Sequence, residues 1–481
     1  MKILVTVVIA WSLAACSRTG SEPTRISFAD RDAAVSWSRP SSTPPQSYAD
    51  TVDKVSPAVV TIRSARRVRA PQQFPFIDDP FFRRFFGFGN PPRNRGGGGA
   101  VERGLGSGVI VDANGDILTN HHVVDGAEQI TVEMPNRKTY SAKLVGSDPP
   151  SDLAVLRINA SNLPILTLGN SDQVKVGDVC LAIGNPLGIG ETVTAGIISA
   201  KSRATGLSDG NFEDFLQTDA PINQGNSGGA LVNTSGELIG INSQILSTTG
   251  GNIGIGFAIP SNMAKTVMAQ LVKNGKVRRG QLGVSIQPVT SDIAANLGLG
   301  EARGVLVSSV TPSSPADKGG IKVGDVILAM NGQPTNSSNE LRNRVAAAGP
   351  GADVSLTVWR SGKEQEVKTK LTELTLEGAQ NPQQPSAAPA GAGQLGLGVR
   401  PLTPEDSAPR GVTGLVVESV DPAGPAAEAG IQVGDVISEV NRQPVRSSDD
   451  LRAALQKTGS RPALLLLHRE GQAIFLTITP R

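Results

Sequence analysis

Residues 219–230 have the sequence Asp-Ala-Pro-Ile-Asn-Gln-Gly-Asn-Ser-Gly-Gly-Ala and open into the strand-like run Leu231-Val232. A single serine among glycines is compatible with an ordinary turn, and it is also typical of a serine nucleophile. Gly225 permits a tight turn, so that the backbone N–H groups of Gly225 and Ser227 can face one point and stabilise an oxyanion. The functional interpretation requires a base elsewhere in the chain, because a free hydroxyl is a weak nucleophile.

The chain has three histidines, of which His121 and His122 are adjacent and His468 lies near the C-terminus. We therefore expect the base within the pair, where neighbouring side chains point in different directions and only one can face Ser227. A carboxylate must orient that imidazole, and Asp148 and Asp152 are candidates; Asp152 directly precedes an apolar run that could partly bury it. The chain order His, Asp, Ser favours a catalytic triad. Two adjacent histidines could also bind a metal, but no third ligand cluster lies nearby in sequence.

These segments resemble the protease domain of the HtrA (Do, DegP-like) family of envelope serine proteases, over about residues 48–481. The resemblance implies a mostly β chain with a chymotrypsin-like double β-barrel, and it places the family's base on His122, within Thr119-Asn120-His121-His122-Val123-Val124. His121 occupies a position that is usually Asn in the family. The implied catalytic residues are His122, Asp152 and Ser227, with the oxyanion hole at Gly225 and Ser227. No metal or cofactor is implied.

The resemblance also implies how a substrate is bound. Gly225, Asn226 and Ser227 would contact it, and the segment of residues 243–247 would pair with its backbone as an added strand. That segment consists of Ser243, Gln244, Ile245, Leu246 and Ser247. Where a trypsin-type pocket has an Asp, six residues before the serine, this chain has Pro221. We therefore expect a pocket for small aliphatic side chains. Arg203, in the loop before Asp214, would be the regulatory residue of the family; otherwise it is a solvated surface arginine.

The C-terminal third contains a repeat in four parts. Leu282-Gly283-Val284 corresponds to Leu395-Gly396-Leu397, and the downstream matches include Val-Gly-Asp-Val-Ile at residues 323–327 and 433–437. Two aligned copies predict two similar domains. Both copies resemble PDZ domains, which are α+β. The two Leu-Gly segments would then bind the terminal carboxylate of a peptide.

Composition sets the limits of these interpretations. The chain has 481 residues, enough for about three domains, with 55 Gly, 33 Pro and 4% aromatic residues, which favours β-rich domains with many turns. A net charge of +2 gives no electrostatic reason to expect nucleic-acid binding. Of the two cysteines, Cys180 lies in an apolar run and is expected to be a buried strand thiol, while Cys16 ends the targeting segment.

We expect residues 1–15 to be a signal peptide, because a short apolar run follows Lys2. Leu13-Ala14-Ala15-Cys16 resembles a bacterial lipobox, in which Cys16 would be lipidated and tether the protein to a membrane; the alternative is ordinary signal cleavage. The remaining domain boundaries that we expect are 16–47 for a flexible tether, 48–275 for the protease domain, 278–375 for the first PDZ domain, 376–393 for a linker and 394–481 for the second PDZ domain.

A loop at residues 64–104 interrupts the barrel and holds seven of the twelve phenylalanines, which are Phe74, Phe76, Phe81, Phe82, Phe85, Phe86 and Phe88. Exposed aromatic residues in a loop usually mark a contact surface. The resemblance implies that this loop reaches another subunit, and we expect a trimer or a multiple of trimers. Packing of the loop on its own barrel is the alternative.

Together these features predict an exported, ATP-independent serine endoprotease of the bacterial periplasm that degrades misfolded envelope proteins and binds their C-terminal peptides. The alternative is a holdase that binds unfolded chains through its PDZ domains.

Overall fold

The computed structural model describes residues 47–67, 101–185, 190–205, 212–223, 225–245, 252–375, 395–403, 406, 412–459 and 461–479. The predicted signal peptide, Cys16, nearly all of the tether, all seven loop phenylalanines and the linker at 376–393 lie outside these ranges, as do Leu246 and Ser247.

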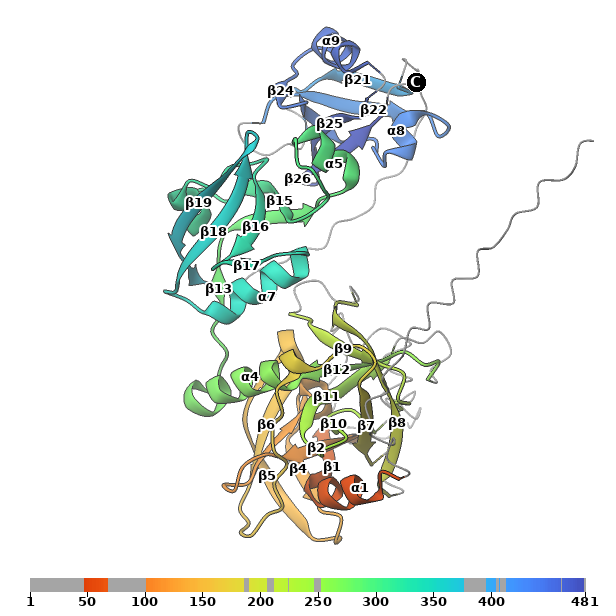
Figure 1. The fold of residues 1–481 in the computed structure, drawn as a ribbon, viewed down its shortest axis with the longest axis vertical. Helices are drawn as coiled ribbons and strands as arrows, with labels where there is room; N and C mark the ends of the chain where they lie inside the picture. The colour runs from red at the N-terminus through yellow and green to blue at the C-terminus, as the bar shows by residue number, and fades with distance from the viewer. Residues whose placement is uncertain are drawn as a thin grey trace, which may run out of the picture. The chain divides into compact units, whose positions relative to one another are not determined.

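Six strands form a first closed barrel in the order β1-β2-β3-β6-β5-β4 (Figure 1). A short helix α1 (Ala49–Val55) and the 3₁₀ turn η1 (Ser56–Ala58) precede it. The strands are β1 (Val59–Arg67), β2 (Val101–Ile110), β3 (Asp116–Thr119), β4 (Gln129–Glu133), β5 (Thr139–Asp148) and β6 (Leu153–Ile158). Two short turns of helix interrupt them, α3 (His121–Val124) after β3 and η2 (Pro149–Ser151) after β5. Of the predicted triad members from this half, His122 lies in the helical turn after β3 and Asp152 lies directly before β6.

A second closed barrel has the order β10-β11-β12-β9-β8-β7. Its strands are β7 (Val179–Gly184), β8 (Thr192–Arg203), β9 (Phe215–Thr218), β10 (Ala230–Asn233), β11 (Leu238–Ile245) and β12 (Gly256–Pro260), and η3 (Ser171–Gln173) lies in the segment before it. Cys180 is fully buried in β7, as predicted. The β11–β12 register shifts between Asn242 and Gln244, so that Ser243 is a bulged residue without a partner position on β12.

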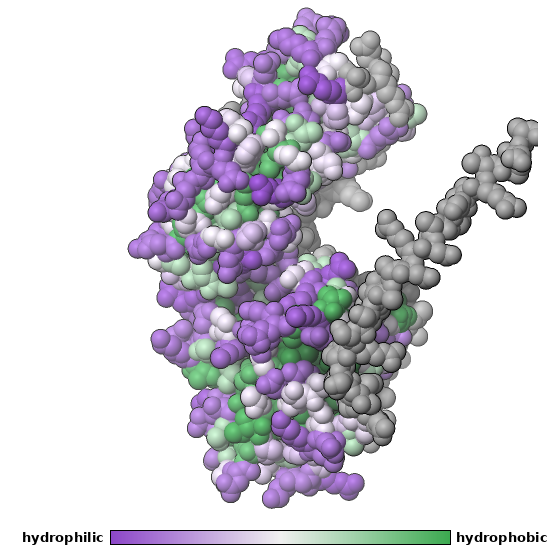
Figure 2. All heavy atoms as spheres, viewed as in Figure 1, coloured by the Kyte–Doolittle hydropathy of each residue, from purple (hydrophilic) through white to green (hydrophobic). Residues whose placement is uncertain are grey.

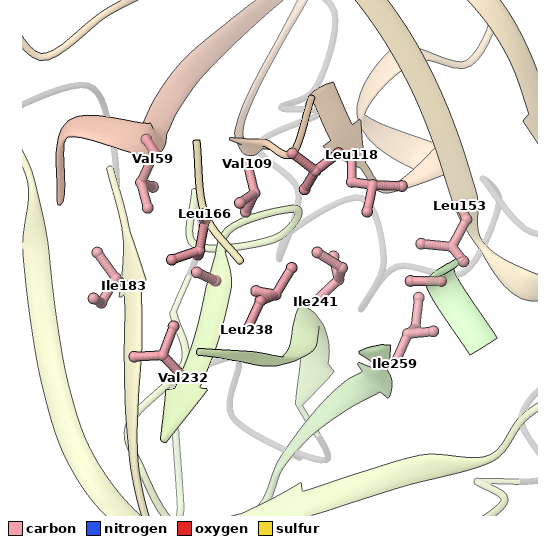
Figure 3. Close-up of a cluster of buried hydrophobic side chains, with 14 of the residues drawn as sticks. Val59, Val109, Leu118, Leu153, Leu166, Ile183, Val232, Leu238, Ile241 and Ile259 are labelled. Atoms are coloured by element: carbon pink, nitrogen blue, oxygen red, sulfur yellow. The ribbon is translucent and has the colours of Figure 1, made fainter. Parts of the chain in front are cut away.

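The two barrels share a buried apolar core (Figure 3). Val59, Val109, Leu118 and Leu153 project into it from the first barrel, and Ile183, Val232, Leu238, Ile241 and Ile259 project from the second. At about 25 cal/mol per Å² of apolar surface removed from water, burying each of these aliphatic side chains contributes roughly 1.5–3 kcal/mol. This packing holds the strand ends of one barrel against those of the other, where a site can form.

Helix α4 (Ser261–Asn274) follows β12 and ends at Gly275, whose left-handed φ of 70° terminates it. Pro260 is the cap position, Ser261 is the first helical residue, and its hydroxyl donates to the Gly169 carbonyl at 2.8 Å. Val267 and Leu271 are buried on one face of the helix.

The C-terminal repeat forms two sheets of one topology, β14-β15-β16-β18-β19 and β21-β22-β23-β25-β26, with a short strand beside the third of each. The first contains β13 (Gly280–Gln281), β14 (Val284–Pro288), α5 (Ser291–Asn296), β15 (Val305–Val310), α6 (Pro315–Gly319), β16 (Val326–Met330), β17 (Gln333–Pro334), α7 (Ser338–Ala348), β18 (Asp353–Arg360), β19 (Lys363–Lys370) and β20 (Thr372–Glu373). The second contains β21 (Leu397–Pro401), β22 (Leu415–Val420), α8 (Pro425–Glu428), β23 (Val436–Val440), β24 (Gln443–Pro444), α9 (Ser448–Thr458), β25 (Ala463–Arg469) and β26 (Gln472–Ile478). The predicted class, a mostly β double barrel followed by two α+β domains, is confirmed.

A repeated ion pair explains part of the repeated sequence. The Arg360 guanidinium donates to both carboxylate oxygens of buried Asp325, at 2.7 and 2.6 Å. Arg469 donates in the same way to buried Asp435, at 2.7 Å to each oxygen. A buried carboxylate needs such a two-pronged partner, which accounts for the aspartate in both copies of Val-Gly-Asp-Val-Ile.

The visible face of the described residues is mainly hydrophilic, with apolar side chains gathered in small separate areas (Figure 2). Within the described ranges, no helix combines the length and the hydrophobicity needed to cross a bilayer.

Candidate active site

Asp152 lies between η2 and β6 in a left-handed conformation, with a φ of 53°. Non-glycine residues seldom adopt this region, and aspartate is among those that tolerate it. Two hydrogen bonds to the Asp152 carbonyl hold this conformation. The Asp152 carbonyl accepts from Asn120 Nδ2 at 2.9 Å and from the His121 N–H at 3.1 Å. The start of β6 and the α3 turn are thereby joined through the backbone of Asp152.

The imidazole of His122 contacts this carboxylate directly. Its Nδ1 lies 2.9 Å from each carboxylate oxygen, and the His122 backbone N–H donates to Oδ1 at 3.1 Å. Burial by itself raises the pKa of the Asp152 carboxyl, but attraction to His122 and hydrogen bonds from His122 and Ser243 outweigh burial and hold that pKa below its ordinary value. Asp152 is therefore an anion at neutral pH, and it fixes the proton of the imidazole on Nδ1.

The ring of His121 points elsewhere. Its Nδ1 lies 3.3 Å from Ser147 Oγ on β5, and its Nε2 lies 3.6 Å from Asp125 Oδ1. Of the two adjacent histidines, only His122 places its ring on Asp152.

Ser227 is buried in the turn that leads into β10. The turn approaches β2 so closely that a Cβ atom on Gly228 would lie 2.1 Å from the Ser107 carbonyl oxygen, and Gly228 has a φ of 82°. Both conditions require glycine after the serine. The Ser227 hydroxyl donates to the Ser243 carbonyl at 2.9 Å.

Ser243 connects the two barrels at the site, because its hydroxyl donates to Asp152 Oδ2 at 2.9 Å while its carbonyl accepts from Ser227. We expected this residue only as the start of the substrate-binding strand. The sequence did not indicate its contact with the carboxylate, because the contact depends on the β11 bulge, and nothing in the local residue pattern marks a bulge.

Gly225 has a φ of 95°, and Asn226 is buried with its N–H donating to the Asn223 carbonyl at 3.0 Å. The predicted oxyanion residues thus lie in one tight turn. The Ser227 hydroxyl donates to Ser243, and Ser243 in turn donates to the Asp152 carboxylate that contacts His122, so Ser243 links the hydroxyl to the imidazole–carboxylate pair. A hydroxyl, an imidazole and an ionised carboxylate are the groups that acyl transfer to serine requires.

The predicted substrate strand and pocket lie beside this turn. Gln244 is half-buried and Ile245 is buried at the end of β11. A Cβ atom on Gly256 of β12 would meet Ile222 Cδ1 at 3.0 Å, and Ile222 is fully buried. Apolar groups therefore occupy the space between β12 and the segment before the serine, while Pro221 is exposed.

The two predicted carboxylate-binding segments have matching geometry. Gly283 and Gly396 have φ values of 80° and 69°. Their carbonyls accept from the N–H groups of Thr311 and Asp421, at 2.9 and 2.7 Å, so both segments share the same backbone contact. Leu282 and Leu395 are buried, and Val284 and Leu397 begin β14 and β21, each a terminal strand of its sheet. A terminal strand has backbone groups that an added peptide strand can pair with.

Arg203 is exposed and is the last residue of β8, where it pairs with Phe215. Our prediction placed it in a loop, but the strand runs further than its apolar residues suggested, because the backbone ladder continues past an irregularity after Ala200.

Two contacts between the first PDZ-like sheet and the barrels were not predicted. Asn339 and Asn343 of α7 both donate to the Glu213 carbonyl at 2.7 Å. The Arg279 guanidinium donates to both oxygens of Asp148, at 2.8 and 2.5 Å, and stacks on Phe212 at 4.5 Å. These partners are distant in sequence, and single polar residues give no signal of such pairing.

Comparison with known families assigns the parts of the chain. Residues 106–241 match a trypsin-like peptidase domain, and residues 280–371 and 416–469 match PDZ domains.

Individual proteins similar to this one match it over most of its length. It is 42% identical over 436 residues to a probable periplasmic serine protease do/HhoA-like of Haemophilus influenzae, covering 89% of this chain and 91% of that protein. It is 41% identical over 470 residues to a probable periplasmic serine endoprotease DegP-like of Brucella melitensis, covering 91% and 90%. A solved structure of the HtrA-type protease AlgW with a decapeptide is 46% identical, with a TM-score of 0.54, and covers 68% of this chain and 99% of its own.

Proposed function

Because the chain belongs to the HtrA (Do, DegP-like) family and is a serine endopeptidase with PDZ domains, we propose that Ser227, His122 and Asp152 cleave misfolded proteins of the cell envelope. The observation that supports this assignment best is the bidentate approach of His122 Nδ1 to Asp152, with Ser243 joining Asp152 to Ser227.

In the proposed reaction, Ser227 Oγ attacks the scissile carbonyl and His122 Nε2 accepts its proton. The N–H groups of Gly225 and Ser227 stabilise the oxyanion. His122 then protonates the leaving amine. In the second half of the reaction, His122 Nε2 takes a proton from water, which attacks the acyl-enzyme, and then returns the proton to Ser227 Oγ. Asp152 keeps the proton on Nδ1 and stabilises the imidazolium without being protonated itself.

Turnover of unfolded casein tests this function. Wild type should release soluble peptides without ATP, and Ser227→Ala should leave casein intact while still binding it. The alternative, a holdase with a secondary proteolytic role, is not favoured by the named relatives; it predicts that both proteins suppress aggregation equally and that wild type cuts casein only slightly.

The cut sites in casein test the pocket. Buried Ile222 beside β12, with no acidic residue at position 221, favours cleavage after Val, Ile or Ala. Mass spectrometry of the peptides should find these residues at most of the new C-termini. A majority of Lys or Arg at these ends would contradict the proposed pocket and leave the proteolytic function intact.

We also propose that peptides bound to the first PDZ domain control the protease. The peptide would pair with β14 beside α7, with its carboxylate at Leu282-Gly283-Val284; Leu395-Gly396-Leu397 would have this role in the second domain. Asn339 and Asn343 extend from α7 to the Glu213 carbonyl, and this carbonyl lies two residues before Phe215, the strand partner of Arg203. A peptide that prefers the active arrangement shifts the population toward it by its differential affinity.

A peptide with an apolar C-terminal residue should raise hydrolysis of a short reporter by about 5- to 150-fold, the usual range of such coupling. Arg203→Ala and the double variant Asn339→Ala/Asn343→Ala should lose much of this stimulation. Arg342→Ala, on the exposed side of the same helix, is the matched control and should retain it. Equal stimulation of all four proteins would rule out this route.

For location and assembly, we propose a periplasmic protein that is held at a membrane through lipidated Cys16 and assembles as a trimer or a multiple of it through its protease domains. The relatives named above are described as periplasmic, which supports the compartment. Native mass spectrometry of the detergent-extracted protein should give the mass of at least three chains, each carrying lipid. A monomer, or a chain without lipid, would contradict the respective part.

A further inference from the structure

Ser107, on β2, is fully buried and contacts the nucleophile turn at two points. Its backbone N–H donates to the Ser227 carbonyl at 2.8 Å. Its hydroxyl donates to the Gly225 carbonyl at 2.6 Å. Gly225 and Ser227 are the two residues whose N–H groups form the proposed oxyanion hole, so one residue of the first barrel holds the carbonyl of each.

The hydroxyl of Ser107 is itself fixed in direction. The Asn185 N–H, at the end of β7, donates to Ser107 Oγ at 2.9 Å, which leaves the hydroxyl proton for Gly225. Asn185 is anchored in turn, because its Nδ2 donates to Thr61 Oγ1 on β1 at 2.6 Å. The Ser107 carbonyl accepts from Thr119 Oγ1 at 2.7 Å. The surroundings therefore set the orientation of every polar atom of Ser107.

The close approach depends on small neighbours. A Cβ atom on Gly184 would lie 2.8 Å from Asn226 Cα and 3.0 Å from Ser107 Oγ. A Cβ atom on Gly106 would lie 3.2 Å from the Ser227 carbonyl oxygen. Glycines on both sides of Ser107 thus allow β2, the β7 end and the turn to meet around one hydroxyl.

Gly225 needs such an external hold. A glycine with a φ of 95° has no side chain to restrict its backbone, and its torsions alone leave its N–H direction loosely set. The peptide unit after Gly225 is planar, and it is bonded at both ends: its carbonyl accepts from Ser107, and its N–H, on Asn226, donates to Asn223. With that plane fixed, the direction of the Gly225 N–H can vary only through the φ and ψ torsions of Gly225 itself.

We propose that Ser107 is a positioning residue for the oxyanion hole, acting through the hydrogen bond from its hydroxyl to the Gly225 carbonyl. The inference rests on the proposed serine-protease function and adds a determinant of rate in the first barrel. Ser107 touches neither substrate nor reacting atoms. Its effect falls on the transition state, because the oxyanion exists only there and in the tetrahedral intermediates.

The test compares Ser107→Ala with wild type on a short peptide. Removing a direct oxyanion donor costs about 10²- to 10³-fold in kcat, so loss of a positioning contact should cost about 10- to 100-fold, with KM nearly unchanged. A peptide aldehyde, whose serine adduct carries an oxyanion, should lose affinity by the same factor as kcat/KM. Binding of the uncleaved peptide, measured in the Ser227→Ala background, should not change.

Two further variants separate positioning from folding. Ser261→Ala removes another fully buried hydroxyl that donates to a carbonyl in the same domain, and it should keep wild-type kcat whatever its melting temperature. Ser107→Cys nearly keeps the shape of the side chain but offers only a weak S–H donor, so it should show the same loss of kcat. This variant replaces Ser107→Ala in the test if the alanine variant does not fold.

Two results with folded Ser107→Ala, or with the cysteine variant in its place, would overturn the inference. One is a kcat/KM within about 2-fold of wild type, and the other is a loss of kcat without a loss of aldehyde affinity. Absence of hydrolysis and of aldehyde binding in wild type would overturn the proposed function as well. The wild-type measurement therefore distinguishes the two failures.

Discussion

Replacing His122 by Ala should lower kcat/KM for a short peptide substrate by about 10⁴-fold or more, whereas His121→Ala should keep most of the activity. The ring of His122 contacts both oxygens of Asp152, and that of His121 lies between Ser147 and Asp125. Without His122, the Ser227 proton has no imidazole to accept it, and the Asp152 carboxylate loses the hydrogen bonds from the His122 ring.

Initial rates of both alanine variants, measured beside Ser227→Ala, decide the assignment. His122→Ala should fall to the level of Ser227→Ala, because members of a triad act as a unit and their losses do not add. His121→Asn is the conservative control, since asparagine occupies this position in the resembled family. The reverse order of the two histidine variants would transfer the role of base to His121.

The sequence alone could predict those features of the site that depend on residues close together in the chain. Glycines around Ser227 mark a turn that must come close to another strand, and the structure places the Gly228 Cα where any Cβ atom would strike the Ser107 carbonyl. Likewise, the repeated Val-Gly-Asp-Val-Ile predicted two domains of one kind, and in the structure each copy buries its aspartate against an arginine.

The contacts that sequence reasoning missed are those in which a residue acts outside its own segment. Ser243 reaches Asp152 only because β11 bulges, and Arg279 finds Asp148 across a separation of 131 residues. The sequence neighbours of such a serine or arginine do not differ from those of a serine or arginine that is exposed to solvent. Strand ends were also misjudged, as at Arg203, since backbone pairing continues where the side chains are already exposed.

Replacing Asp152 by Asn should lower kcat by about 10⁴-fold while the fold is retained. The reason lies in which donors reach each oxygen. Oδ1 accepts from the His122 backbone N–H, which can only donate, so the asparagine oxygen must occupy that place. Its amide nitrogen then replaces Oδ2, where it donates to His122 Nδ1, while the Ser243 hydroxyl turns to accept. The imidazole proton is thereby forced onto Nε2, which can no longer accept a proton from Ser227.

Two measurements test this account. Nitrogen NMR of the labelled histidine should show the neutral ring of wild type protonated on Nδ1 and that of Asp152→Asn protonated on Nε2. Ser243→Ala, which removes one donor but keeps the charge and the tautomer, should lose only about 10-fold in kcat, the value of one hydrogen bond to a charged group. An Asn variant that keeps more than a tenth of wild-type kcat, or that shows the wild-type tautomer, would mean that Asp152 does not orient the base. The geometry predicts otherwise, because the amide nitrogen that replaces Oδ2 lies 2.9 Å from His122 Nδ1 and can only donate, so Nδ1 must accept and the ring proton moves to Nε2.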